Sequence, residues 1–174
     1  PSFHNAALVP QARDALAAEH AERGRACILC IDEGHLLGHD ALEALRLLTN
    51  HRLDTESPFA TILLGQPTLA AKMALGTLAA LEQRITVRRT MTGMTSDETA
   101  GYIRHHLQLA GRSDPLFTDD ATALIHESGR GKPRAVNRLA LAALIAACAG
   151  GKNLVDEASA RSAVTETNHE HQPA

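Results

Sequence analysis

Continuous apolar runs alternate with helix-like stretches along the first half of the chain. Residues 26–31 (ACILCI) and 60–65 (ATILLG) are unbroken apolar runs, which is typical of strands covered on both faces in a parallel sheet. Residues 85–89 (ITVRR) alternate apolar and polar positions, which predicts a third and more exposed strand. Strands that alternate with helices in this way predict an open parallel α/β sheet.

Start and stop signals place the helices between these strands. Pro10 is predicted to open the helix before the first strand, and Gly24 to close it. Asp40 is predicted to be the N-cap of the next helix, because Glu43 follows three residues later and completes a capping box.

From Met94 onward the pattern is helical only. The sequence therefore predicts an α/β part over residues 1–93, an all-helical part over 94–165 and a disordered tail over 166–174. Four positions are predicted to start the helices of this second part: Thr95 (with Glu98 as its capping-box partner), Thr118, Pro133 and Asp156.

Composition narrows the class of protein. The 174 residues are 44% hydrophobic and 21% charged, which is ordinary for a folded domain, and the net charge of −3 gives no strongly basic nucleic-acid footprint. Three cysteines are too few for a disulfide framework, so we expect a reducing, cytoplasmic setting. The chain holds no apolar run of about 18 residues, the minimum for a membrane-spanning helix, so we expect no membrane association.

The strongest local signal for chemistry is the acid pair Asp32–Glu33, which directly follows the first apolar run. Open α/β folds bind ligands at the carboxyl ends of their strands, where these two acids are expected. In a nucleotide hydrolase, one such acid holds Mg²⁺ and the other polarises the attacking water. The same pair is also compatible with a solvated strand end at which Asp32 turns the chain.

Two arginines add weaker signals. Arg134 is predicted in the first turn of the helix that starts at Pro133, where a cation opposes the helix dipole, so a bound anion such as phosphate is expected nearby. Arg84 lies between a predicted helix and a predicted strand, from which an arginine can reach a neighbouring subunit. Taken alone, each arginine is also compatible with an ordinary solvated position.

Other patterns do not indicate a site. Cys27 and Cys30 show C-x-x-C spacing, but they lie in an apolar strand where positions i and i+3 face opposite sides, so we interpret both as core residues. The segment 129–132 (GRGK) lacks the spacing of a phosphate loop and follows a helix. The histidines show no metal-ligand spacing, and no metal cage is predicted.

The order of seven segments resembles one family, the AAA+ group that includes general secretion pathway protein A and the helper ATPases of transposition. The resemblance runs from residue 10 to residue 164 and looks closer to the transposition helpers, through His35 and the LALAAL run of residues 139–144. The segments are IDEGHLL (31–37), ALEALRLLTN (41–50), ILLGQPTL (62–69), LEQRITVRRT (81–90), TSDETAGYIRHHLQLAG (95–111), PLFTDDATALIHESGRGKPRAVNRLALAAL (115–144) and LVDE (154–157).

The resemblance implies a role for each of five residues. Asp32 would assist Mg²⁺ and Glu33 would be the general base, as the Walker B acids. Gln66 would be the sensor-1 group that reads the γ-phosphate. Arg84 would be the arginine finger offered to an adjacent subunit, and Arg134 would be sensor 2 in a helical lid.

The resemblance also implies an ATP- and Mg²⁺-dependent homo-oligomeric switch that acts on DNA and stimulates a transposase. DNA binding would be led by phosphate contacts from a basic cluster at residues 130–138. Two alternatives are a secretion-associated ATPase and a non-catalytic interaction module. The Walker A phosphate loop, G-x-x-x-x-G-K-[ST], is absent from these 174 residues and is expected upstream of Pro1. We therefore expect the chain alone to bind ATP poorly and to hydrolyse it negligibly, which leaves its standing as an enzyme open.

Overall fold

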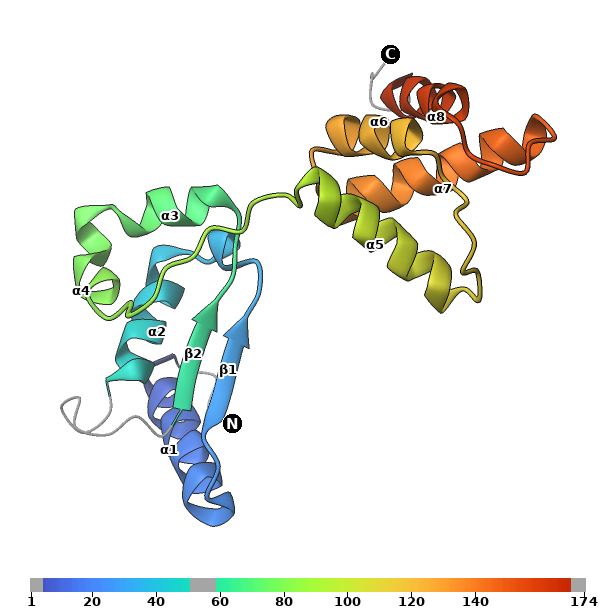
Figure 1. Ribbon diagram of the computed structural model, residues 1–174. Coiled ribbons are helices and arrows are strands. Elements are labelled where there is room, and N and C mark those ends of the chain that lie inside the picture. Colours follow the sequence, from blue (N-terminus) through green and yellow to red (C-terminus); the bar gives the residue numbers. More distant parts are fainter. Residues whose placement is uncertain (1–4, 51–58, 170–174) are drawn as a thin grey trace. The chain divides into compact units, whose positions relative to one another are not determined.

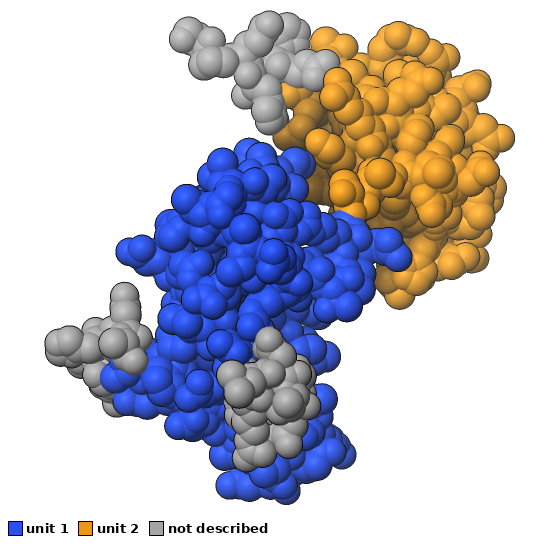
Figure 2. Space-filling model, turned by 90° about the vertical axis from the view of Figure 1, so that its left-hand side faces the viewer, with its two compact units in different colours: residues 1–89 blue, residues 90–174 orange. Residues whose placement is uncertain are grey.

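The computed structural model describes residues 5–50 and 59–169 (Figure 1). The chain divides into two compact units, residues 1–89 and residues 90–174 (Figure 2). The sequence predicted the boundary between residues 93 and 94. In the structure the second unit starts at Thr90, so the irregular segment 90–95 groups with the helices.

In the residues that the structure describes, the first unit contains a two-stranded parallel sheet and its connecting helices. Strand β1 pairs with β2 in the register Cys27↔Phe59 to Ile31↔Leu63. Two short 3-10 turns, η1 (Gly34–Leu36) and η3 (Gly76–Leu78), join these elements. The strands and helices are α1 (Asn5–Arg23), β1 (Cys27–Ile31), α2 (His39–Thr49), β2 (Phe59–Leu63), α3 (Pro67–Met73) and α4 (Ala79–Glu82).

Helices α1 and α2 cover one face of this sheet. Leu45 and Leu48 of α2 pack there against Phe59 and against the inward residues of β1, with Val9 and Leu16 of α1 beside them. A second core joins Leu42 of α2 to α3, η3 and α4 through Leu69, Met73, Leu78 and Leu81.

The other face of the sheet is exposed in the described chain. Ile28 is 66% exposed and Ile62 is 44% exposed, and the exposed Cys30, the register partner of Ile62, lies on the same face. Two predictions are therefore wrong for the described residues: that both faces of the sheet are covered, and that Cys30 is a core residue. The apolar run indicated the strand correctly, but α1 and α2 both pack on the side of Cys27, Leu29 and Ile31.

The third predicted strand, residues 85–89, is not a strand. The segment is irregular, and Val87 is 68% exposed. A strand requires a neighbour for its backbone hydrogen bonds, and the described sheet contains only β1 and β2. Alternation of apolar and polar residues was therefore an insufficient signal here.

Two helix starts in the first unit differ from the prediction. Helix α1 already includes Asn5, so Pro10 lies inside it, where a proline removes one backbone hydrogen bond and crowds the carbonyl four residues earlier. Gly38 is the N-cap of α2, and Asp40 lies in its first turn, where a carboxylate favours the helix dipole without capping it. Glu43 pairs with Arg46 instead of completing a capping box, with an Oε2–Nε distance of 2.8 Å. Gly24 does follow the end of α1, with a φ of 62°.

The described residues of the second unit form four helices, α5 (Ser96–Leu109), α6 (Asp119–Gly129), α7 (Pro133–Ala149) and α8 (Glu157–His169). Its predicted starts are confirmed. Thr95 and Glu98 form a reciprocal capping box, Thr118 accepts a hydrogen bond from Ala121 N, and Pro133 is at the start of α7. Asp156 precedes α8 and accepts a hydrogen bond from Ser159 N. Buried side chains from all four helices, together with Val155 before α8, form one core: Ile103, Ala121, Ile125, Val136, Leu139, Ala143, Ala147, Val155, Ala160 and Ala163.

Helix α8 continues into the range for which the sequence predicted disorder. It ends at His169, and Thr167 is 7% exposed. Ala160, Ala163 and Thr167 follow one another at helical spacing on the buried side, so packing sustains the helix through a polar sequence. The remaining residues, 170–174, lie outside the described part of the chain.

Candidate functional site

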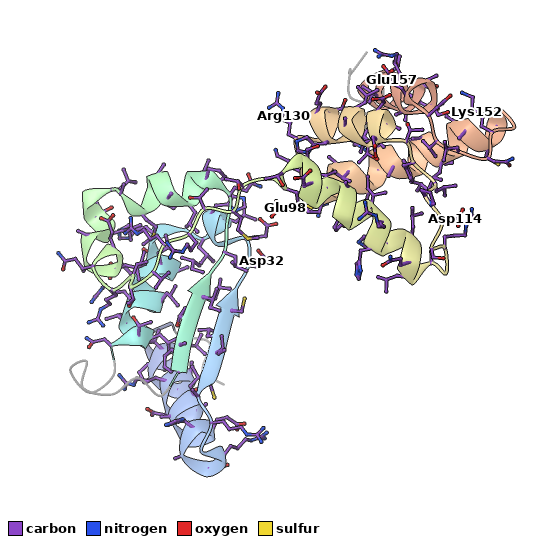
Figure 3. All side chains as sticks on the ribbon, in the orientation of Figure 1. Asp32, Glu98, Asp114, Arg130, Lys152 and Glu157 are labelled. Atoms are coloured by element: carbon purple, nitrogen blue, oxygen red, sulfur yellow. The ribbon has the colours of Figure 1, made fainter. Side chains whose placement is uncertain are left out.

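The acid pair lies where the carboxyl ends of the two parallel strands meet. Asp32 directly follows β1, and Figure 3 shows it at the tip of that strand. The Glu33 amide donates a hydrogen bond to Asp32 Oδ1 over 2.7 Å, so Asp32 also shapes the turn. Both acids are exposed. One carboxylate oxygen of Asp32 therefore serves the backbone, and the second is available to a ligand.

Glu33 has a strained backbone conformation. Its φ of 54° and ψ of 32° are left-handed, which costs a residue with a side chain roughly 1–2 kcal/mol. Such strain persists only where the surroundings enforce it, and it concentrates at functional positions. The sequence did not indicate this feature, because glutamate is not a residue that favours the left-handed region.

The turn after β1 is held by contacts to β2 and α3. The Gly34 amide donates to Leu64 O over 2.7 Å, and a Cβ at Gly34 would lie 2.5 Å from Leu63 Cδ1. Lys72 of α3 donates from Nζ to His35 O over 2.7 Å and to Leu37 O over 2.8 Å. Sequence reasoning missed Lys72, since a lysine on a short helix carries no signal of its own.

His35 connects the acid pair to the end of β2. Its Nδ1 lies 3.3 Å from Glu33 Oε2 and accepts a hydrogen bond from the Gln66 amide over 3.4 Å. Gln66 is the N-cap residue of α3, although its side chain makes no capping hydrogen bond. The structure thus brings Asp32, Glu33 and Gln66, three of the five predicted site residues, together at one edge of the sheet.

Arg84 belongs to the same unit and lies in the turn after α4. Its amide donates to Leu81 O over 3.0 Å, and its side chain is partly buried. The neighbouring Arg88 is exposed and pairs with Glu82 over 3.0 Å. The role of Arg84 as an arginine finger stays a prediction.

Arg134 belongs to the second unit. It is exposed in the first turn of α7, which contains no acidic residue, and Lys132 is the N-cap of that helix. The amino end of α7 is therefore rich in positive charge. That Arg134 and the acid pair converge on one ligand stays a prediction.

The loop before α7 is fastened to the segment before α5 by backbone contacts. The Met94 amide donates to Gly131 O over 2.9 Å. A Cβ at Gly131 would lie 2.0 Å from Met94 O, and a Cβ at Gly93 would lie 2.2 Å from Arg130 O. Figure 3 shows Arg130 at the junction of α6 and α7. Both glycines are therefore required by close backbone approach.

The thiols and the histidines do not form a further site in the described chain. Cys27, Cys30 and Cys148 are free, and Cys27 and Cys30 lie on opposite faces of β1, as predicted. Among the described residues, no group of three histidine, cysteine, aspartate or glutamate side chains is arranged to hold a metal ion. Within the same residues, no helix combines the length and the apolar character needed to cross a bilayer.

Comparison with known proteins adds a family to this geometry. A family model described as an AAA domain matches residues 3–73. General secretion pathway protein A of Aeromonas hydrophila is 36% identical over 143 residues, which cover 82% of this chain and 26% of that protein. This chain therefore spans about a quarter of the length of the curated relative that it matches.

Solved structures show the same fold. RuvB of Thermotoga maritima, described as a Holliday junction branch migration motor, matches with a TM-score of 0.56 and 19% identity over 88% of this chain and 49% of its own. A variant of that protein matches with a TM-score of 0.62 and 18% identity over the same shares of the two chains. At this identity the likeness is one of fold alone.

Proposed function

Because the chain belongs to the AAA+ group that includes general secretion pathway protein A, we propose that it is the Walker B-to-lid portion of a longer ATPase. Its fold class, a partial α/β P-loop NTPase core followed by helices, is the one predicted. In this proposal residues 1–93 are core and residues 94–165 are the lid. The observation that carries it is the acid pair Asp32–Glu33 at the tips of two parallel strands, with Gln66 beside it.

The chemistry of the acid pair fits this role. Mg²⁺ prefers oxygen ligands, and Asp32 retains one carboxylate oxygen beyond the one that accepts from Glu33. When bound, Mg²⁺ neutralises charge that develops on the phosphates. Glu33 is 62% exposed at its side chain, so its carboxylate is accessible to an attacking water. Gln66 provides a polar group at the end of the neighbouring strand, in the place of a γ-phosphate sensor.

The two arginines supply positive charge in this proposal. Arg84 completes the site of an adjacent subunit, and Arg134 contacts the nucleotide from the lid. Such a site also needs the amides and the lysine of a phosphate loop, which these 174 residues lack. The chain alone is therefore expected to give no micromolar ATP binding in isothermal titration, and a micromolar Kd would contradict this part of the proposal.

The output of the switch is the second part of the proposal. The 36% identity to general secretion pathway protein A favours a secretion-type role. A transposition helper that binds DNA and a transposase is the alternative, and it rests on His35 and on residues 139–144. Binding of duplex DNA by the ATP-bound longer protein would favour the alternative, provided that the logarithm of the affinity falls linearly with the logarithm of the salt concentration.

Substitution of Arg84 tests the proposed ATPase function. In the longer protein, Arg84→Ala is expected to retain ATP binding and to lose turnover by ~10³–10⁵-fold. The exposed neighbour Arg88 gives a matched control, Arg88→Ala, which is expected to keep turnover near that of the unaltered protein.

Mixed oligomers sharpen this test. Oligomers made only of Glu33→Gln subunits, or only of Arg84→Ala subunits, are expected to be inactive. A mixture of the two contains interfaces that pair an intact Glu33 with an intact Arg84 from the neighbour. We expect turnover to reappear on mixing. A mixture that stays inactive although it forms mixed oligomers would show that Arg84 does not act across a subunit interface.

A further inference from the structure

One ring nitrogen of His35 faces two groups, one of which needs a hydrogen-bond donor and the other a hydrogen-bond acceptor. Nδ1 lies 3.3 Å from the Glu33 carboxylate, which can only accept a hydrogen bond, and 3.4 Å from the Gln66 amide, which can only donate one. A neutral imidazole presents either N–H or a lone pair at Nδ1. His35 therefore satisfies Glu33 or Gln66, but not both at once.

The surroundings keep the ring between these two partners. The His35 side chain is 11% exposed, and Lys72 fixes the backbone through its bond to His35 O. On the other side, a Cβ at Gly65 would lie 3.1 Å from His35 N, so the two segments approach closely. The ring has little freedom to turn away, and the position of its proton decides which partner it holds.

We propose that His35 is a positioning residue that shares Nδ1 between Glu33 and Gln66, and so couples the orientation of the Glu33 carboxylate to the end of β2. With N–H at Nδ1, His35 holds the carboxylate. With a lone pair at Nδ1, it holds the Gln66 amide and releases Glu33, whose side chain is 62% exposed and free to rotate. The consequence for ATP hydrolysis rests on the proposed function, whereas the coupling itself does not.

The coupling is measurable in the chain without nucleotide. The probes are the ¹⁵N signal of His35 Nδ1, which distinguishes N–H from lone pair, and the exchange of the Gln66 amide with water, both recorded in mildly alkaline buffer where imidazoles are neutral. In Glu33→Ala, Nδ1 is expected to shift to the lone-pair form. The Gln66 amide is then expected to exchange about threefold to tenfold more slowly, because it donates to Nδ1 without competition from Glu33.

The reverse perturbation removes the amide. The φ of −68° at Gln66 suits proline, so Gln66→Pro deletes the N–H donor at a compatible backbone angle. Nδ1 is then expected to shift to the N–H form and to hold Glu33. Gln66→Ala keeps the amide and removes only the side chain, so its Nδ1 signal is expected to match that of the unaltered chain.

Asp40→Asn provides a second control. It removes a carboxylate whose Oδ1 lies 3.9 Å from Nδ1 of a different histidine, His39, so the Nδ1 signal of His35 is expected to stay unchanged. An Nδ1 signal that is the same with and without Glu33 overturns the proposal. So does a Gln66→Ala variant that shifts Nδ1 as far as Gln66→Pro. If Gln66→Pro does not fold, the Glu33→Ala result decides alone. If the proposed ATPase function is wrong, these outcomes for His35 remain as expected. Failure of the function can therefore be distinguished from failure of the coupling.

Discussion

The glycine at position 131 gives the most quantitative prediction for the second unit. Gly131 has a φ of 63°, so Gly131→Ala places an alanine in the left-handed region, which costs about 1–2 kcal/mol. Its new Cβ would also lie 2.0 Å from Met94 O, an overlap with backbone rather than with a flexible side chain. Relief requires the segments to separate, which removes the bond from the Met94 amide to Gly131 O and costs a further ~0.5–1.5 kcal/mol.

Gly151 offers a matched control in the same unit. Its φ is 65°, and a Cβ there would meet nothing within 4 Å. Gly151→Ala therefore carries only the backbone term, partly offset by about 0.4–1 kcal/mol from the stiffer unfolded chain. The same offset applies to Gly131→Ala. We therefore expect the free energy of unfolding to fall by about 1 kcal/mol for Gly151→Ala and by about 1–3 kcal/mol for Gly131→Ala.

Hydrogen exchange resolved by mass spectrometry reads the two units separately. In a domain of this size, about 1 kcal/mol corresponds to roughly 4–8 °C in Tm, so thermal unfolding should also separate the two variants. Equal losses of stability for Gly131→Ala and Gly151→Ala would show that the contact with Met94 contributes nothing.

Two further predictions concern the independence and the pH response of the units. Leu42 is fully buried, so Leu42→Ala should destabilise the first unit by about 2–5 kcal/mol and leave amide exchange in α5–α8 unchanged; slower or faster exchange there would contradict independent units. The hydrogen bond from Arg112 lowers the pKa of Asp114 from 3.8 to about 2. This contribution to stability is therefore present above pH 3.8 and is lost as the pH falls through 2. Asp114→Asn should flatten the acid limb of the unfolding curve of the second unit, and an unchanged limb would contradict this assignment.

The helical unit was the part most accessible from sequence. Its start signals are local, because a capping threonine, a proline at the first helical position and an aspartate before α8 act within one turn of the chain. What the sequence missed there is the extent of α8, whose last turn depends on Thr167 facing the core, a tertiary effect.

The strands show the opposite balance. The apolar runs located β1 and β2. However, the helices that cover a strand and the strand that pairs with it come from distant parts of the sequence. The predictions for the face at Ile28 and for segment 85–89 were therefore wrong. Strand and turn chemistry predicted Asp32 and Glu33 at the strand tip. The left-handed backbone of Glu33 and the contacts of His35 to both Glu33 and Gln66 depend on packing against residues 64–66. They could therefore not be predicted from the sequence.

We propose that Glu33 activates water at an ATP site that also includes Asp32 and Gln66. Its most direct test is a pair of measurements on the longer protein with Glu33→Gln, namely ATP affinity and single-turnover hydrolysis. We expect an ATP affinity close to that of the unaltered protein and a rate of hydrolysis lower by ~10²–10⁴-fold. Hydrolysis that continues at the unaltered rate while ATP stays bound would contradict it.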